Sequence, residues 1–357
     1  MIKKYSICFL VLFPLILTFF LEGCKVQTDP EKPAAETRQP TEENSPTAGL
    51  PVPSGEPSPF TGLPVKEIFD CPYAVIVENE RAARPQAGLQ EAELVYEAPV
   101  EGGITRFLAF YMSPLEKDIG PVRSARPYFA YLAHEFDGIL AHCGYSIHTE
   151  AVLADLKLKH INEIPHPAYF QRQKSRKRPH NLYTSLSLLA TGAEKFNYPP
   201  GNPPAEFFYF VEQEKPKEPV SSIALAFNSR NNVEYRWNPR GTYTRYNDGS
   251  PFIDTNHETP VEVKNIIVQH INTRVFTEEG HLEITLLGEG KGYFFSSGNM
   301  EKIKWKKDSY QERTHFYKAD GSVLRLAPGN TWIHLLPPGG KMEWEAEKRL
   351  DQGEEGL

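Results

Sequence analysis

The pattern of apolar and polar positions predicts a mixed arrangement of strands and helices in the first half of the chain. β-branched and aromatic runs predict strands, and apolar residues at helical spacing predict helices. The predicted strands are 73–78, 94–98, 104–112 and 138–143, and the predicted helices are 128–136, 150–158 (capped by Thr149) and 185–196 (capped by Thr184 or Ser185). Because strands and helices do not alternate strictly, the pattern favours an α+β fold, with a layered sheet-and-helix N-terminal domain.

From about residue 204 the pattern changes to short apolar runs. The predicted strands of this half are 206–211, 222–227, 233–237, 242–246, 261–271, 282–287, 293–296, 302–306, 314–317, 323–326 and 331–336. Turn-forming pairs such as Asp248-Gly249, Ser297-Gly298 and Asp320-Gly321 lie between them and are typical of hairpins. The second half is therefore predicted to be a mostly β domain, either a sandwich or a partly closed barrel.

The first residues have the pattern of a secretory signal. Lys3 and Lys4 precede an uncharged apolar run over residues 5–21, and Gly23-Cys24 follows. The end of this segment resembles a bacterial lipobox, which implies cleavage after Gly23 and a diacylglycerol on Cys24. We therefore expect a protein anchored by lipid at the extracytoplasmic face of the cell membrane; the alternative is an uncleaved signal anchor.

Composition shifts divide the rest of the chain. Residues 25–59 are rich in proline and poor in large apolar side chains, so they are expected to form a disordered linker. The predicted organisation is a signal peptide (1–23), a lipidated cysteine and linker (24–59), an N-terminal domain (60–203), a C-terminal domain (204–337) and a flexible acidic tail (338–357).

Charge and cysteine content narrow the classes of partner. The formal net charge of −7 argues against nucleic acid, which favours a basic face. Outside the signal and Cys24, the cysteines are Cys71 and Cys143, and they could form a disulfide or remain separate buried thiols. The histidines lack metal-site spacing, so neither a metal nor another cofactor is expected.

Several motifs together resemble the YerB-like lipoprotein family, which has an N-terminal and a C-terminal domain. The matching stretches are 84–89, 96–97, 101–107, 120–126, 179–185, 265–269 and 329–333. The resemblance implies a layered α+β arrangement of sheet and helices over roughly residues 60–337. Because the family has no assigned function, it implies no catalytic residues.

A loop with two arginines is the strongest candidate for binding. Arg123 and Arg126 lie between a predicted strand and a helix that begins near Pro127, where free backbone N–H groups favour an anion. The predicted ligand-binding residues are Arg84, Arg106, Arg123, Ser124, Arg126, Asn181 and Tyr183. The alternative is a structural ion-pair network with Glu97, Glu101 or Asp118.

Three residues are weaker candidates for catalysis. Glu97 and Glu101 flank a strand end and could act as acid and base on a wall glycan, or could be solvated or ion-paired glutamates. His180 could act as a base, or could serve only in capping or packing. The favoured hypothesis is binding of a cell-envelope component, a glycan or an envelope protein, through an arginine-lined cleft. The alternative is a wall-glycan hydrolase or lyase.

Overall fold

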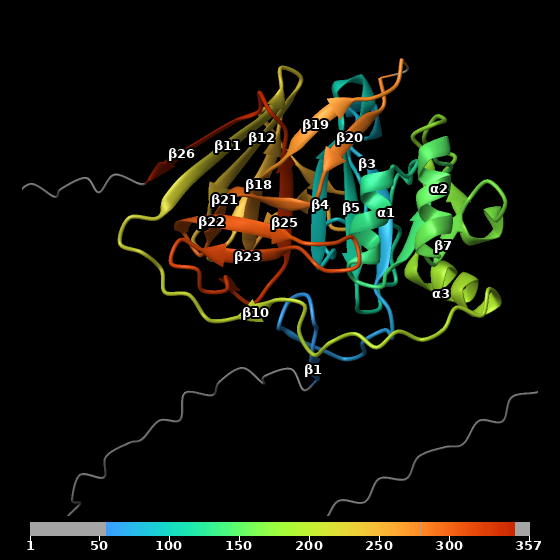
Figure 1. Ribbon diagram of the computed structural model, residues 1–357, viewed down its shortest axis with the longest axis horizontal. Helices are drawn as coiled ribbons and strands as arrows, with labels where there is room; N and C mark the ends of the chain where they lie inside the picture. The colour runs from blue at the N-terminus through green and yellow to red at the C-terminus, as the bar shows by residue number, and fades with distance from the viewer. Residues whose placement is uncertain (1–54, 279, 347–357) are drawn as a thin grey trace, which may run out of the picture. The chain divides into compact units, whose positions relative to one another are not determined.

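A computed structural model describes residues 55–278 and 280–346. The predicted signal peptide, Cys24, most of the predicted linker and the last residues of the predicted tail lie outside these ranges. The described strands form two large sheets and several two-stranded ribbons (Figure 1).

The larger sheet has ten strands and contains residues from both halves of the chain. Its order is β23 (His315–Lys318), β22 (Asn299–Lys307), β21 (Gly288–Ser296), β18 (Asn265–His270), β25 (Thr331–Leu336), β4 (Leu94–Pro99), β5 (Thr105–Tyr111), β3 (Tyr73–Glu78), β6 (Ile139–His142) and β7 (His160–Asn162). The two halves meet where β25 pairs in parallel with β4, with Thr331 opposite Leu94. One continuous sheet therefore joins both halves.

The second sheet belongs to the C-terminal half. Its order is β14 (Ser250–Pro251), β13 (Tyr243–Asn247), β12 (Asn231–Trp237), β11 (Val220–Asn228) and β26 (Lys341–Ala346), and β17 (Glu262–Val263) also pairs with β13. The ribbons are β1 (Glu56–Pro57) with β2 (Pro64–Val65), β8 (Gln171–Arg172) with β9 (Leu182–Tyr183), β10 (Tyr209–Phe210) with β24 (Arg325–Leu326), β15 (Ile253–Asp254) with β16 (Thr259–Pro260), and β19 (Asn272–Val275) with β20 (Leu282–Thr285).

Alternation along the strands divides the core into two layers, one on each face of the ten-stranded sheet. On β4, Tyr96 joins the cluster that includes Phe129 of α1 (Pro127–His134) and Leu153 of α2 (Ile147–Leu156). On the other face, Val95 joins the cluster that includes Ile223 of the second sheet, together with residues of α3 (Leu186–Lys195). The short 3-10 helices are η1 (Arg81–Ala83), η2 (Glu101–Gly103) and η3 (Pro167–Tyr169).

The α+β class and the mostly β second half are confirmed, and the described strands form open packed sheets and no closed barrel. Local turn chemistry also agrees with the prediction. Asp248 and Gly249 both have positive φ (51° and 80°) in the hairpin between β13 and β14. Such a turn requires φ values that asparagine, aspartate and glycine tolerate best. Ser185 caps α3 and accepts a hydrogen bond from the Leu188 N–H.

Several boundaries differ from the prediction, and three of the differences matter for the fold. Ordered structure begins before residue 60, because β1 pairs with β2 and the Ser58 hydroxyl, which is buried, donates to Glu93. Helix α2 begins at Ile147 rather than after Thr149, with Ser146 as the N-cap. The predicted tail contains β26, in which Met342 and Trp344 alternate with polar residues and pack against the core shared by both sheets.

Candidate functional site

A fully buried ion pair lies between the two large sheets. Glu97 on β4 and Arg245 on β13 are both 0 % exposed, and Arg245 Nη2 lies 2.8 Å from Glu97 Oε2. His334 on β25 places its Nδ1 3.1 Å from the same oxygen, and its Nε2 lies 2.9 Å from the Tyr235 hydroxyl. Burial alone would raise the pKa of Glu97, but Arg245 and His334 together lower it to about 2.

Aromatic rings surround the Arg245 guanidinium. Its central carbon lies 4.7 Å from the Trp332 ring centroid, 4.9 Å from that of Phe252 and 5.3 Å from that of Phe107. This arrangement replaces part of the hydration that burial removes. Glu97 is thus a structural partner of Arg245, and its geometry gives no support to the role of glycan acid or base.

An open pocket of about 540 Å³ lies between η1 and the β13–β14 hairpin, and Phe252 contributes both to this pocket and to the aromatic rings around Arg245. We call it the junction pocket. Its lining residues are Arg81, Arg84, Pro85, Gln86, Asn247, Asp248, Ser250, Pro251, Phe252 and Ile253. One side comes from the first half of the chain and the other from the second half. Ligand sites are common at such junctions.

Two guanidinium groups share one carboxylate oxygen in the junction pocket. Asp248 Oδ2 lies 2.9 Å from Arg84 Nη1 and 3.2 Å from Arg81 Nε. Burial would raise the pKa of Asp248, but hydrogen bonds from Arg84 and Arg81 lower it, so the carboxylate stays charged. The Arg84 side chain is 17 % exposed and the Arg81 side chain 73 % exposed, so Arg81 can turn toward a ligand at little cost.

The buried network supports the walls of the junction pocket. Asn79 donates to Glu97 Oε1 (3.1 Å) and accepts a hydrogen bond from Arg84 Nε (3.2 Å). Arg245 Nε donates to the Asn247 side chain (3.0 Å). Arg84 on one side of the pocket and Asn247 on the other are therefore both connected to the buried Glu97–Arg245 pair. Such supporting hydrogen bonds fix the geometry of a binding site.

The three arginines around the 120–127 loop form a separate group, which we call the arginine cluster (Arg106, Arg123 and Arg126). Arg126 makes two hydrogen bonds to Glu101, at 2.7 and 2.9 Å. Burial would raise the pKa of Glu101, but Arg126 lowers it. A general acid needs the opposite shift, so Glu101 has the features of the ion-pair alternative.

Arg106 differs from its neighbours because it has no carboxylate within ion-pair distance in the described part of the chain. Its Nη1 donates to the Ser124 carbonyl (2.8 Å). Burial lowers the pKa of Arg106 to about 10. Repulsion from the Arg126 charge adds to this shift, and repulsion from Arg123 contributes a smaller part. The arginine cluster thus contains two ion pairs, Arg126 with Glu101 and Arg123 with Glu78. Its third member, Arg106, is a buried cation held by a backbone carbonyl.

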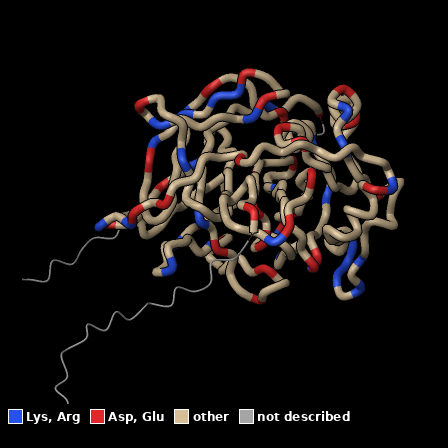
Figure 2. The backbone as a smooth tube through the Cα atoms, turned by 90° about the horizontal axis from the view of Figure 1, so that it is seen from below, with Lys and Arg blue, Asp and Glu red and all other residues tan. Residues whose placement is uncertain are grey.

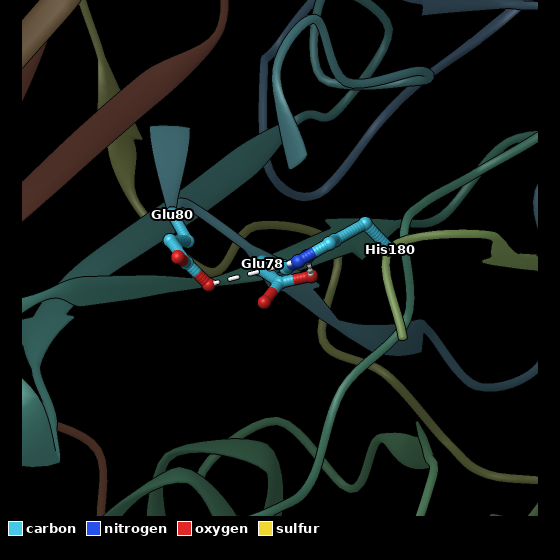
Figure 3. A group of neighbouring side chains, drawn as sticks. All are labelled: Glu78, Glu80 and His180. Atoms are coloured by element: carbon cyan, nitrogen blue, oxygen red, sulfur yellow. Dashed lines mark hydrogen bonds and ion pairs between the residues drawn. The ribbon is translucent and has the colours of Figure 1, made fainter. Parts of the chain in front are cut away.

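Glu78, Glu80 and His180 form a compact group at the end of β3 (Figure 3). One ligand atom from each lies within 4.8 Å of the others, a spacing that could suit a metal ion. However, Arg123 Nε lies 2.9 Å from Glu78 Oε1, and His180 Nδ1 lies 2.9 Å from Glu78 Oε2. Because each oxygen of this buried carboxylate already lies 2.9 Å from a side-chain nitrogen, we assign the group to contacts within the protein. His180 is oriented by Glu78 and lies outside the junction pocket.

The remaining predicted residues have mainly structural contacts. The Ser124 hydroxyl donates to the Cys143 carbonyl (2.8 Å), and Asn181 accepts a hydrogen bond from Arg172 (3.1 Å). The Tyr183 hydroxyl, which is buried, accepts from Arg176. The structure therefore brings Arg106, Arg123, Ser124 and Arg126 together, and places Arg84 in a different site.

Sequence reasoning missed most of the junction pocket. Arg81, Asn247, Asp248 and Phe252 were absent from the predicted site, although Asp248 was recognised as part of a hairpin turn. No local signal connects Asp248 with Arg84, which is 164 residues away.

The two cysteines are separate thiols and form no disulfide in the described ranges. Cys143 donates to Glu163 (3.2 Å), and Cys71 lies 2.9 Å from Lys159 Nζ. This resolves the alternative between a disulfide and two buried or half-buried thiols in favour of the thiols.

Comparisons with known proteins agree over both halves. Family models described as Protein of unknown function (DUF3048) match as an N-terminal domain over residues 60–199 and as a C-terminal domain over residues 223–333. The protein named Putative lipoprotein YerB of Bacillus subtilis (strain 168) is 35% identical over 273 residues, which are 74% of this chain and 81% of that protein. The crystal structure of the YerB protein from Bacillus subtilis superposes on this fold with a TM-score of 0.71 and 33% sequence identity. The match covers 80% of this chain and 99% of the YerB chain. Since both the sequence and the fold match across the two halves, the chain belongs to the DUF3048 family, with the N-terminal and C-terminal domains of the YerB-like lipoproteins.

Proposed function

We propose that this protein is a lipid-anchored envelope protein that binds an anionic ligand in the junction pocket. The observation that carries the proposal is the sharing of one Asp248 oxygen by Arg81 and Arg84 within a pocket of about 540 Å³. Two guanidinium groups against one carboxylate leave an excess positive charge. Arginine is suited to planar recognition of carboxylate or phosphate oxygens.

The pocket also has an apolar component. Phe252 and Pro251 lie beside the charged groups, so a ligand with an anionic group and a ring or other apolar body fits best. Such a ligand could be a part of a wall glycan or of an envelope protein. The net charge of −7 continues to argue against nucleic acid.

The wall-glycan hydrolase alternative has less support. The pKa values of Glu97 and Glu101 are both lowered by neighbouring cations, despite burial. Glycan hydrolysis needs one carboxylic acid that stays protonated, which requires a raised pKa. Neither glutamate has that property.

Replacing Arg81 by Gln is expected to weaken binding of phenyl phosphate about tenfold or more, as loss of a charge-assisted hydrogen bond does. Stability should change little, because the Arg81 side chain is 73 % exposed. Isothermal titration of the full chain with phenyl phosphate and with inorganic phosphate measures this effect. The apolar lining predicts that phenyl phosphate binds more tightly than phosphate.

Arg240→Gln is the matched control, because the Arg240 side chain is 72 % exposed and pairs with Glu262 outside the pocket. Equal affinities of the Arg81→Gln and Arg240→Gln variants would contradict the proposed site. Absence of binding by the wild-type chain would contradict it as well.

The anchor is a separate part of the proposal. Cys24 lies outside the described residues. The name of the relative, Putative lipoprotein YerB, supports lipid attachment, and the choice of Cys24 rests on the lipobox-like sequence before it. Helices of residues 55–278 and 280–346 are too short or too polar to span a membrane. Cys24→Ala should release the protein into the medium or leave it as an unprocessed precursor, as measured by fractionation and intact mass. A processed Cys24→Ala protein that stays on the membrane would refute the lipid assignment.

A further inference from the structure

One face of the ten-stranded sheet carries a row of lysines near its β23 edge. Lys302, Lys304 and Lys306 alternate along β22 and are exposed, while Ile303 and Trp305 between them are buried. Lys291 on β21 is exposed on the same face, directly opposite Lys304. We call these four residues the lysine face.

Ordinary structural reasons do not account for the lysine face. Lysines often protect the edge of a sheet, but β22 is an interior strand between β21 and β23. Like charges directly opposite each other, as at Lys291 and Lys304, destabilise a sheet. This concentration of lysines belongs to a chain whose formal net charge is −7. Acidic and basic residues are both spread over the backbone (Figure 2).

Counter-charges cover only one end of the lysine face. Lys306 pairs with Asp308 at 2.8 Å and lies opposite Glu289. Over the residues that the structure describes, Lys291, Lys302 and Lys304 have no carboxylate at ion-pair distance. Three ammonium groups therefore remain available to an external anion.

Aromatic residues border the same face. Tyr293 lies opposite Lys302, and Tyr317 lies opposite Lys304. Trp344 of β26 packs near Tyr293, with ring centroids 5.6 Å apart, and is 36 % exposed. The tyrosine hydroxyls beside the lysines can donate hydrogen bonds to phosphate oxygens.

We propose that the lysine face binds a linear polymer of phosphate groups. Side chains at alternate strand positions repeat about every 7 Å, so Lys302, Lys304 and Lys306 present charges in a line. A line of charges matches a chain of phosphates better than it matches the plane of a membrane. The lysine face shares no residue with the junction pocket, so this surface is independent of the function proposed above.

Long-chain polyphosphate titrated into the full chain tests the proposal. The wild type should bind with an affinity that falls as salt rises, because binding releases counterions. The double variant Lys302→Gln/Lys304→Gln should bind about tenfold more weakly at low salt and show a shallower salt dependence. Both substituted lysines are exposed, so the melting temperature of the double variant should equal that of the wild type.

The matched control is Lys174→Gln/Lys177→Gln, which removes the same charge from the loop after β8. Retention of wild-type affinity by the control supports the lysine face. Equal weakening of both double variants, or no binding of polyphosphate by the wild type, would overturn the proposal. Preferential binding to phosphatidylglycerol vesicles without polyphosphate binding would overturn it in favour of a membrane surface.

Discussion

Replacing Glu97 by Gln is expected to lower the free energy of unfolding by about 3–5 kcal/mol, because it leaves the Arg245 charge buried without its carboxylate. Glu97, Arg245 and His334 are all 0 % exposed, so water cannot replace the lost partner. The melting temperature should fall by about 10 °C for a domain of this size. Thermal and urea unfolding of the full chain measure the change.

Two further variants separate charge burial from general sensitivity of the fold. Glu234→Gln alters an exposed pair with Arg236 and should change stability by less than about 1 kcal/mol. Glu97→Leu combined with Arg245→Met removes both charges and should recover part of the loss. If Glu97→Gln is as stable as the wild type, the ion pair does not hold the two sheets together.

The second large effect concerns acid. His142 on β6 is fully buried, with Nε2 3.1 Å from His160 Nδ1 and Nδ1 2.9 Å from the Gly144 carbonyl. Burial lowers the pKa of His142 to about 3, and His160 adds to the shift, although the Gly144 carbonyl opposes it.

The sign of the pH dependence follows from this shift. The unfolded chain protonates the histidine below its ordinary pKa of 6.5, while the folded chain resists protonation until about pH 3. The unfolded state therefore binds more protons in this window, and stability falls as pH falls from 6.5 toward 3. From pH 7 to pH 5 the loss due to His142 should be about 2 kcal/mol.

His142→Gln should reduce this pH-dependent loss by about 2 kcal/mol, even if the variant is less stable at pH 7. Urea unfolding at pH 7 and pH 5 measures the difference. His148→Gln, which removes an exposed histidine from the same part of the chain, is the control. An unchanged loss in His142→Gln would show that His142 is not the group that resists protonation.

The candidate site was only partly predictable. The sequence singled out Arg84 as a candidate ligand-binding residue, and the structure places it in the lining of the junction pocket. It also left open a pairing of Arg126 with Glu101, which the structure contains. The partner of Arg123 is Glu78, which lay outside the predicted network of Glu97, Glu101 and Asp118. Arg81 and Arg84 meet Asp248, because the β13–β14 hairpin lies beside η1.

The sequence by itself determined the α+β class, the strands and turns of the second half and the mixed character of the first half. These features depend on side-chain period and turn chemistry within a few residues. Even so, Lys341–Ala346 was predicted as part of a flexible acidic tail. Its pairing with β11, more than a hundred residues earlier, is what makes it a strand.

Only the tertiary structure decided which charges meet. Glu97 is buried against Arg245 because β4 lies beside β25 in the ten-stranded sheet and the second sheet covers that face. The order of strands is set by long-range packing of both halves, and a sequence pattern carries no local record of it. The same glutamate could therefore be interpreted from sequence as a catalytic acid, while its position between two sheets makes it the carboxylate of a buried ion pair.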